Sequence, residues 1–162
     1  QLKISTLSRE EALIRPARLV VATNALGSTL IAGIDVEPAV NHVLVTDGIP
    51  DFGFPHAVHI DAGYVYARPI ENRMLIGGGR HWGLDETATR NRLMALMHEI
   101  WPATEAAGIA YQWSGLLGVG KDRSPIVKRF APNAAAAVRL GGMGVAIGME
   151  VGRMAAEEIA MN

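Results

Sequence analysis

Glycine-rich turns hold the residues of this sequence whose types and spacing could most directly do chemistry. The segment Gly141-Gly142-Met143-Gly144 precedes a helical stretch that runs to about Ala160. A helix N-terminus carries about half a positive charge and several free N–H groups, which suits a phosphate, a carboxylate or an anion developing on a ring. The alternative is a tight turn before a closely packed helix, since glycine clusters also occur in plain turns.

Glycine recurs every four residues in the expected C-terminal helix, at Gly144, Gly148 and Gly152. These three residues share one helix face, and each costs roughly 1 kcal/mol relative to alanine in a helix interior. We therefore expect another backbone or a ligand to approach this face closely.

A second run, Gly77-Gly78-Gly79, stands at the end of an expected strand and is followed by Arg80-His81-Trp82. Three glycines in succession permit positive φ angles and the close approach of a ligand. A flexible hairpin end explains the run more simply, and the pattern favours that explanation.

The histidines do not have the spacing of a metal site. His56 and His59 are three residues apart in an expected strand, so they point to opposite faces. The other three, His42, His81 and His98, show no ligand spacing, and the sequence contains no cysteine. We therefore predict no metal site. No Gly-x-Ser-x-Gly elbow and no P-loop motif is present either.

The composition is that of an ordered protein of one domain's length. Of the 162 residues, 49% are hydrophobic and 19% are charged, which excludes disorder. A net charge of −1, with both signs interspersed, and an aromatic content of 6% argue against nucleic-acid binding. No apolar run approaches the roughly 18 residues of a membrane span, and no secretory signal opens the chain, so we expect a cytoplasmic protein.

Alternating and short apolar runs predict an α+β fold with a mixed, mainly antiparallel sheet. Gly27, Gly33 and Pro38 interrupt the stretch after the second strand. Short polar connections at Asp61-Ala62-Gly63 and Glu71-Asn72-Arg73 indicate hairpins. Strands are expected at 2–7, 18–22, 42–46, 57–60, 64–68, 74–77, 110–113, 116–119, 126–128 and 134–140.

One clear amphipathic helix is expected from about Glu86 to Trp101, packed across the sheet. Asp85 is a suitable N-cap, and Pro102 ends the helix. Its apolar stripe follows the helical spacing and consists of Leu93, Leu96, Met97, Ile100 and Trp101. The charged run Lys121-Asp122-Arg123 is better explained as a solvated loop with local ion pairs than as a catalytic group.

Four segments in this order resemble the C-terminal portion of FAD-dependent oxidoreductases of the D-amino-acid oxidase family, which includes glycine, sarcosine and gamma-glutamylputrescine oxidases. The four are 19–25 (LVVATNA), 66–79 (YARPIENRMLIGGG), 113–127 (WSGLLGVGKDRSPIV) and 141–157 (GGMGVAIGMEVGRMAAE). The resemblance implies a returning segment of an FAD domain at 1–36, a substrate-binding sheet domain at 37–125, and the last strand and helix of the FAD domain at 126–162.

The same resemblance implies FAD as the cofactor and an amine or amino acid as the substrate. The residues that it assigns to the cofactor are Thr23, Asn24, Gly115, Gly141, Gly142, Met143, Gly144 and Val145. The residues that it assigns to the substrate are Tyr66, Arg68 and Arg80. No catalytic base is named, because enzymes of this kind can take the amine in its neutral form.

Two departures from the family pattern limit these expectations. The chain contains neither the Gly-x-Gly-x-x-Gly dinucleotide fingerprint nor the acidic residue that would hold the adenosine ribose. We therefore expect a partner half, either a missing N-terminal segment or a separate chain, to complete the flavin site. The alternatives are a non-catalytic module, a homodimer formed through the uncovered surface, and a small protein that binds an anion at the Gly141–Gly144 turn.

The second departure concerns the substrate. In glycine oxidase and D-amino-acid oxidase an arginine follows the Trp-x-Gly-Leu segment and pairs with the substrate carboxylate, whereas this sequence has Leu117 there. A leucine cannot supply a bidentate clamp. We therefore expect an amine or an N-substituted amino acid, whose acidic group could meet Arg68 or Arg80.

Overall fold

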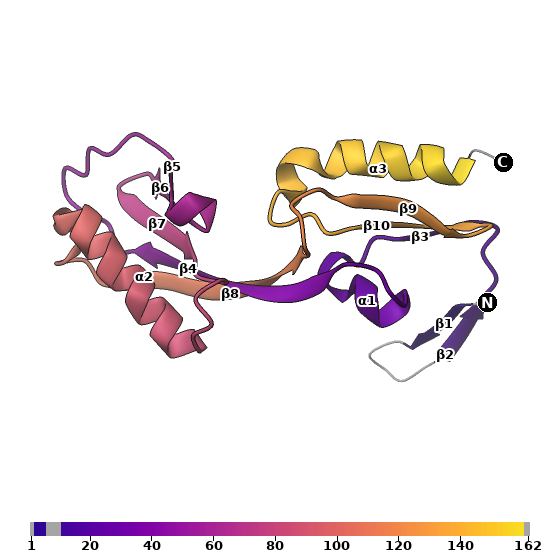
Figure 1. Cartoon of the computed structure of the whole chain (residues 1–162). Helices are drawn as coiled ribbons and strands as arrows, with labels where there is room; N and C mark the ends of the chain where they lie inside the picture. Colours follow the sequence, from indigo (N-terminus) through magenta and orange to yellow (C-terminus); the bar gives the residue numbers. More distant parts are fainter. Residues whose placement is uncertain (1, 6–10, 161–162) are drawn as a thin grey trace. The chain divides into compact units, whose positions relative to one another are not determined.

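The computed structural model describes residues 2–5 and 11–160, which form an α+β fold, as the sequence predicts (Figure 1). The chain divides into two compact units. Unit 1 consists of the segment that ends at Pro38 and the segment that begins at Leu117, and unit 2 is Ala39–Leu116. Among the described helices, none is long and apolar enough to cross a bilayer.

The centre of unit 1 is a three-stranded sheet of mixed direction. Strand β10 lies in the middle, parallel to β3 and antiparallel to β9. The bounds are β3 Leu19–Val21, β9 Ile126–Ala131 and β10 Ala134–Val138. Strand β10 is built almost wholly of alanine, which favours helix in isolation. It is a strand here because every residue is buried between a layer on each face of the sheet.

The two faces of β10 are covered by different elements. Ala137 packs with Val151 and Ala155 of helix α3 (Gly144–Ala160). Ala136 and Val138 point to the opposite face, where they pack with Val21, Ile31 and Val36. Figure 1 shows α3 along one face of this sheet and α1 (Gly27–Leu30) on the other. The small alanine side chains let both layers approach the sheet closely.

A hairpin precedes this sheet in the chain. Strand β1 (Leu2–Ser5) pairs antiparallel with β2 (Glu11–Ile14). The sequence predicts a strand over 2–7, of which residues 6 and 7 lie outside the described part, and it does not predict β2.

Unit 2 is organised around a five-stranded sheet in the order β5-β6-β7-β4-β8. Strand β6 pairs antiparallel with β5 and with β7, and β7 also pairs antiparallel with β4, which confirms the two predicted hairpins. The bounds are β4 Glu37–Thr46, β5 Val58–Ile60, β6 Val65–Ile70, β7 Arg73–Gly78 and β8 Ile109–Val119.

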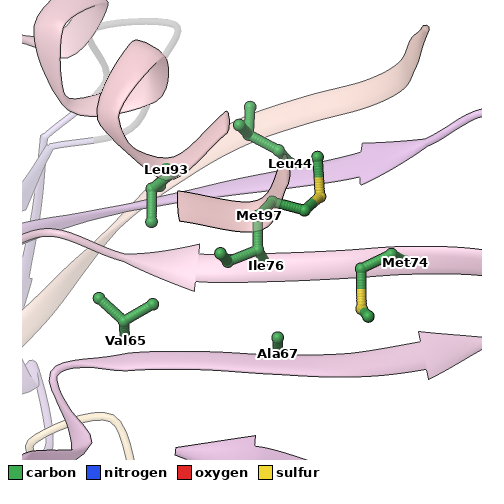
Figure 2. Close-up of a cluster of buried hydrophobic side chains, with 7 residues drawn as sticks. All are labelled: Leu44, Val65, Ala67, Met74, Ile76, Leu93 and Met97. Carbon is green, nitrogen blue, oxygen red and sulfur yellow. The ribbon is translucent and has the colours of Figure 1, made fainter. Parts of the chain in front are cut away.

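The main core of unit 2 lies between this sheet and helix α2 (Glu86–Ile100). Leu93 and Met97 come from α2, one helical turn apart. Figure 2 shows them with the sheet side chains of the same cluster, which are Leu44, Val65, Ala67, Met74 and Ile76. Ile100 was predicted in the apolar stripe but is 41% exposed, because the helix ends there and the chain turns into the 3₁₀ turn Pro102–Thr104.

Two predicted strand boundaries are wrong. The sequence predicts separate strands over 110–113 and 116–119, but β8 runs through Ser114 and Gly115 without a break. The sequence predicts that Pro38 interrupts regular structure, but it is the second residue of β4. Strand β8 stays continuous because it pairs beside β4 in the sheet. Pro38 is tolerated because it stands near a strand end, where an absent N–H costs little.

Asp85 caps α2 as predicted, since its Oδ1 accepts a hydrogen bond from the amide of Ala88 at 2.8 Å. Asp85→Ala is expected to lower the free energy of unfolding of unit 2 by about 1 kcal/mol, because a helix amide loses its acceptor. Asp85→Asn is the control and is expected to retain most of the stability. Urea unfolding followed by tryptophan fluorescence measures both, and equal midpoints for the wild type and Asp85→Ala would contradict the assigned cap.

Candidate functional site

The glycine turn, Gly141–Gly144, connects β10 to α3 by a sharp change of direction. Arg139, Gly141 and Gly142 all have left-handed backbone angles, with φ of 63°, 58° and 93°. A Cβ at Gly142 would stand 3.4 Å from Cδ1 of Leu117. Glycine at this position is therefore required by the backbone angle, and the space on its side-chain side is already limited.

Hydrogen bonds fix the entry of the glycine turn. The amide of Gly141 donates to the carbonyl of Gly118 at 2.9 Å, and that of Met143 donates to the carbonyl of Leu140 at 2.8 Å. The amides of Ala146 and Ile147 both donate to the carbonyl of Met143 at 3.0 Å. The amides of Gly144 and Val145 therefore precede the first hydrogen bonds of the helix.

The side chains around this helix end leave it accessible. Met143 is 55% exposed, and Val145 is fully exposed. An open helix N-terminus of this kind can stabilise an anionic group or a negative charge that develops on a ring.

Asn24 is brought to the glycine turn, although it lies 116 residues before Leu140. Its Oδ1 accepts a hydrogen bond from the amide of Leu140 at 2.9 Å, and its own φ is 45°. A Cβ at Gly118 would stand 2.5 Å from the same Oδ1. Asn24 therefore joins the loop after β3 to the end of β10. The neighbouring Thr23 contributes its carbonyl to Leu26. Contact of either residue with a cofactor stays a prediction.

An arginine that the sequence analysis did not single out lies just before the glycine turn. The side chain of Arg139 is 8% exposed and forms ion pairs with Asp35 and Asp122. The sequence predicts a loop with local ion pairs around Asp122, and the structure adds a partner for Asp122 that is 17 residues away. The only local signal was a single arginine at the end of an Ala-Val run.

Gly115, the remaining residue assigned to the cofactor, lies in β8 within the bounds of unit 2. It is exposed, and a Cβ there would meet nothing within 4 Å. Its role in cofactor binding stays a prediction. Within residues 2–5 and 11–160, no group of three or more histidine, cysteine or acidic side chains could hold a metal ion.

The three residues assigned to the substrate gather in unit 2. Tyr66 in β6 pairs with Gly77 in β7, and a Cβ on Gly77 would stand 2.5 Å from the tyrosine Oη. The ring therefore lies over the glycine. Burial raises the pKa of Tyr66 above its usual value, while the nearby positive charges of Arg68 and Arg80 act in the opposite direction.

These residues lie on the sheet face opposite α2. Tyr66 and Ile70 pack against the buried Val43, Val45 and Leu75, which form a second, smaller cluster. Side chains alternate along a strand, so Arg68 projects to the same face as Tyr66. This face combines an apolar floor with the Tyr66 phenol and the Arg68 guanidinium, and the charge of Arg80 acts on the same phenol. Such a set of groups suits an organic molecule with an acidic group.

The run Gly77–Gly79 is a closely packed strand end rather than the flexible one that was predicted. All three residues are buried. Gly78 and Gly79 have φ of 143° and 85°, and a Cβ at Gly78 would collide with the carbonyl oxygen of Tyr64. The run thus lets β7 meet β6 at backbone distance and places Arg80 directly after the sheet.

An aromatic cluster surrounds Arg80. Its guanidinium carbon lies 4.8 Å from the ring centre of Tyr64, and the same ring stacks on His81 at 4.3 Å. Asp61 joins the cluster, since its Oδ2 lies 2.5 Å from Nε2 of His81 and accepts from Nε1 of Trp82 at 3.3 Å. These hydrogen bonds to His81 and Trp82 hold the pKa of Asp61 below its usual value.

The lowered pKa of Asp61 has a consequence for stability against pH. Its contribution is present above the ordinary pKa of aspartate, about 3.9, and is lost as the pH falls through the lower folded value. Asp61→Asn is therefore expected to reduce stability at neutral pH, and the difference from the wild type shrinks toward about pH 3. The control is Asp51→Asn, because Asp51 is also exposed and has the same φ of 53°. A constant difference in urea midpoints over this range would contradict the expectation.

Comparison with known proteins places the chain in a family. The family model described as "DAO: FAD dependent oxidoreductase" matches residues 3–158. The search of curated proteins gives no match. Solved structures with a similar fold include iminodiacetate oxidase from Chelativorans sp. BNC1, with a TM-score of 0.78 and 16% identity over 98% of this chain and 46% of that one.

Two further structures show the same fold. Glycine oxidase from Geobacillus kaustophilus has a TM-score of 0.74 and 18% identity over 88% of this chain and 41% of that one. L-proline dehydrogenase from P. horikoshii has a TM-score of 0.68 and 20% identity over 86% of this chain and 41% of that one. The chain thus spans slightly less than half the length of these proteins. Because the family model covers nearly the whole described sequence, the chain belongs to the DAO family of FAD-dependent oxidoreductases.

Proposed function

We propose that this chain provides the closing part of a flavin site and the substrate-binding sheet of an oxidoreductase that acts on the C–N bond of an amine or an N-substituted amino acid. The bond would be oxidised to an imine with the bound flavin as the two-electron acceptor, and water would hydrolyse that imine. The observation that carries the proposal is the open helix N-terminus after the glycine turn, in a chain that matches the family over residues 3–158.

The residues of the glycine turn fit a flavin on chemical grounds. FAD supplies a hydride acceptor when it is bound, and its reduction leaves negative charge on the ring. The amides of Gly144 and Val145, backed by the dipole of the 17-residue helix α3, would stabilise that charge. Gly142 allows the backbone to approach the ring because no Cβ stands there. Asn24 and Gly118 fix the start of the turn by accepting hydrogen bonds from the amides of Leu140 and Gly141.

The substrate side of the proposal depends on the charge of unit 2. Leu117 offers no carboxylate clamp, so an acidic group on the substrate needs another cation. Arg68 and Arg80 both act electrostatically on Tyr66 and supply two. The Tyr64 ring restrains the Arg80 guanidinium, which reduces the conformational entropy that ordering would cost. These two cations favour an amine that carries a carboxylate.

An uncovered apolar face on α3 supports the need for a second polypeptide half. Val145 is fully exposed and Met149 is 90% exposed. A Cβ at Gly148 or Gly152 would meet nothing within 4 Å among the described residues. The sequence predicted close approach to these glycines, and none of residues 2–5 and 11–160 makes it. An N-terminal half with the dinucleotide fingerprint, present in the same protein or as a partner chain, is the occupant that we propose.

The second candidate function is a non-catalytic module, which the same uncovered α3 face favours. The two candidates differ in one observable. If the protein is catalytic and is purified with its flavin, an N-methyl amino acid is expected to bleach the visible absorbance of that flavin under anaerobic conditions. A module shows no bleaching with any amine, and a homodimer that covers Val145 and Met149 without flavin would also support the module.

Arg80→Met tests the substrate assignment in the flavin-loaded protein. The expected result is a KM for an acidic amine raised at least tenfold, because the carboxylate loses a cation, with the flavin spectrum unchanged. Arg92→Met is the matched control, since Arg92 stacks on Trp82 at 4.5 Å in the same unit. Equal KM values for the two variants would contradict the role of Arg80.

A further inference from the structure

Arg139 is buried and strained, which is unusual for a charged residue at the end of a strand. Its side chain is 8% exposed and its φ is 63°. A residue other than glycine in this left-handed region is strained, because its Cβ crowds the backbone. Such a conformation persists only where the surrounding structure over-determines it.

The guanidinium of Arg139 has acceptors on two separate loops of unit 1. Its Nε donates to the carbonyl of Ser124 at 2.8 Å, and its Nη2 donates to Oδ1 of Asp122 at 2.7 Å. Its Nη1 donates to the carbonyl of Asp35 at 3.3 Å and also to the Asp35 carboxylate. A planar group with several donors is needed for this pattern, and a lysine ammonium could not reproduce it.

The residues around the guanidinium leave space for the arginine stem and fix its carboxylate partner. A Cβ at Gly120 would stand 2.6 Å from Cδ of Arg139 and 2.6 Å from the Asp35 carbonyl oxygen. The Asp35 carboxylate accepts a further hydrogen bond from the amide of Lys121 at 3.1 Å. Glycine at position 120 thus leaves room for the arginine stem, and one carboxylate serves both the arginine and the loop.

The arginine is directly followed by Leu140 and the glycine turn. Leu140 is bonded to Asn24, and Gly141 is bonded to Gly118. Three successive residues at the entry of the turn thus form hydrogen bonds to other loops. Of these, only Arg139 does so through a charged side chain.

We infer that Arg139, with Asp35 and Asp122, is a positioning residue that fixes the glycine turn in its binding conformation before any ligand arrives. The inference rests on the proposed function for what the turn binds. Preorganised amides stabilise an anion more than amides that must reorient, because no reorganisation accompanies binding.

The test uses Arg139→Met, Arg139→Lys and the control Arg153→Met. Arg153 is also in unit 1 and also pairs with two carboxylates, Glu150 and Glu157, but it is 55% exposed on α3. In the flavin-free chain, amide hydrogen exchange at Leu140, Gly141 and Met143 is expected to be at least tenfold faster in Arg139→Met and intermediate in Arg139→Lys. Arg153→Met is expected to leave these three rates unchanged.

A second measurement separates positioning from general stability. In the flavin-loaded protein, the reduction potential of the flavin is expected to shift to more negative values in Arg139→Met, because the reduced ring loses oriented amides. Asp122→Asn serves where Arg139→Met does not fold, since Asp122 is 62% exposed, and its effect has the same sign but is smaller. Unchanged exchange at the three amides in both variants overturns the inference. Faster exchange with an unchanged flavin potential supports the positioning role and refutes the proposed flavin contact instead.

Discussion

Gly142→Val is expected to weaken flavin binding at least tenfold while leaving unit 2 folded. The φ of 93° at this position lies outside the range of a β-branched residue, and the strain of roughly 1–3 kcal/mol must be relieved by moving the turn. The new Cβ would also stand 3.4 Å from Cδ1 of Leu117, before the two methyl groups are added. Either movement displaces the amides that precede α3.

Gly144→Ala provides the matched control within the same turn. A Cβ there would meet Cδ1 of Leu140 at 3.6 Å, which is ordinary contact. The residue begins α3, where alanine is a better helix former than glycine. Flavin titration followed by absorbance, with circular dichroism to verify the fold, measures both variants. A wild-type affinity for flavin in Gly142→Val would remove the turn from the site.

Gly78→Ala is expected to destabilise unit 2 by at least about 3 kcal/mol. A Cβ at Gly78 would collide with the carbonyl oxygen of Tyr64 and stand 2.8 Å from Cα of Val65, its partner in β6. Both obstacles are backbone, so relief requires opening the β6–β7 pairing that carries the core in Figure 2. The φ of 143° adds strain.

Gly53→Ala is the control for this prediction, because a Cβ there would be 3.9 Å from the Asp51 carbonyl oxygen and from nothing closer. The readout is specific to unit 2, since all three tryptophans, Trp82, Trp101 and Trp113, lie within 39–116. Urea unfolding followed by their fluorescence is expected to show an early transition for Gly78→Ala only. A wild-type midpoint for Gly78→Ala would mean that the two strands do not meet as described.

Local patterns were enough to predict the elements that local energetics decide. The helix α2 has a regular apolar stripe and a capping aspartate, and its bounds differ from the prediction by one residue. The hairpin turns at 61–63 and 71–73 separate strands of the predicted pairing. The sequence predicts separate strands over 110–113 and 116–119, whereas β8, which pairs beside β4, is continuous through Gly115.

The parts that could not be predicted depend on contacts between distant residues. Asp35 and Arg139 are 104 residues apart, and Asn24 and Leu140 are 116 apart. No periodicity links such positions in one sequence. The glycine turn could be predicted because a cluster of glycines indicates a turn. The buried ion pairs of Arg139 before it could not be predicted from the sequence. The same holds for Tyr66, whose ring lies over Gly77 through strand register.

The most direct test of the central claim is the visible absorbance spectrum of the protein purified in its native form. We expect the spectrum of a flavin that is bound by this chain together with a polypeptide half that contains the dinucleotide fingerprint. We also expect that Gly142→Val in this chain loses the colour and that Gly144→Ala keeps it. A colourless protein that stays colourless after FAD is added in the presence of that half would contradict the account.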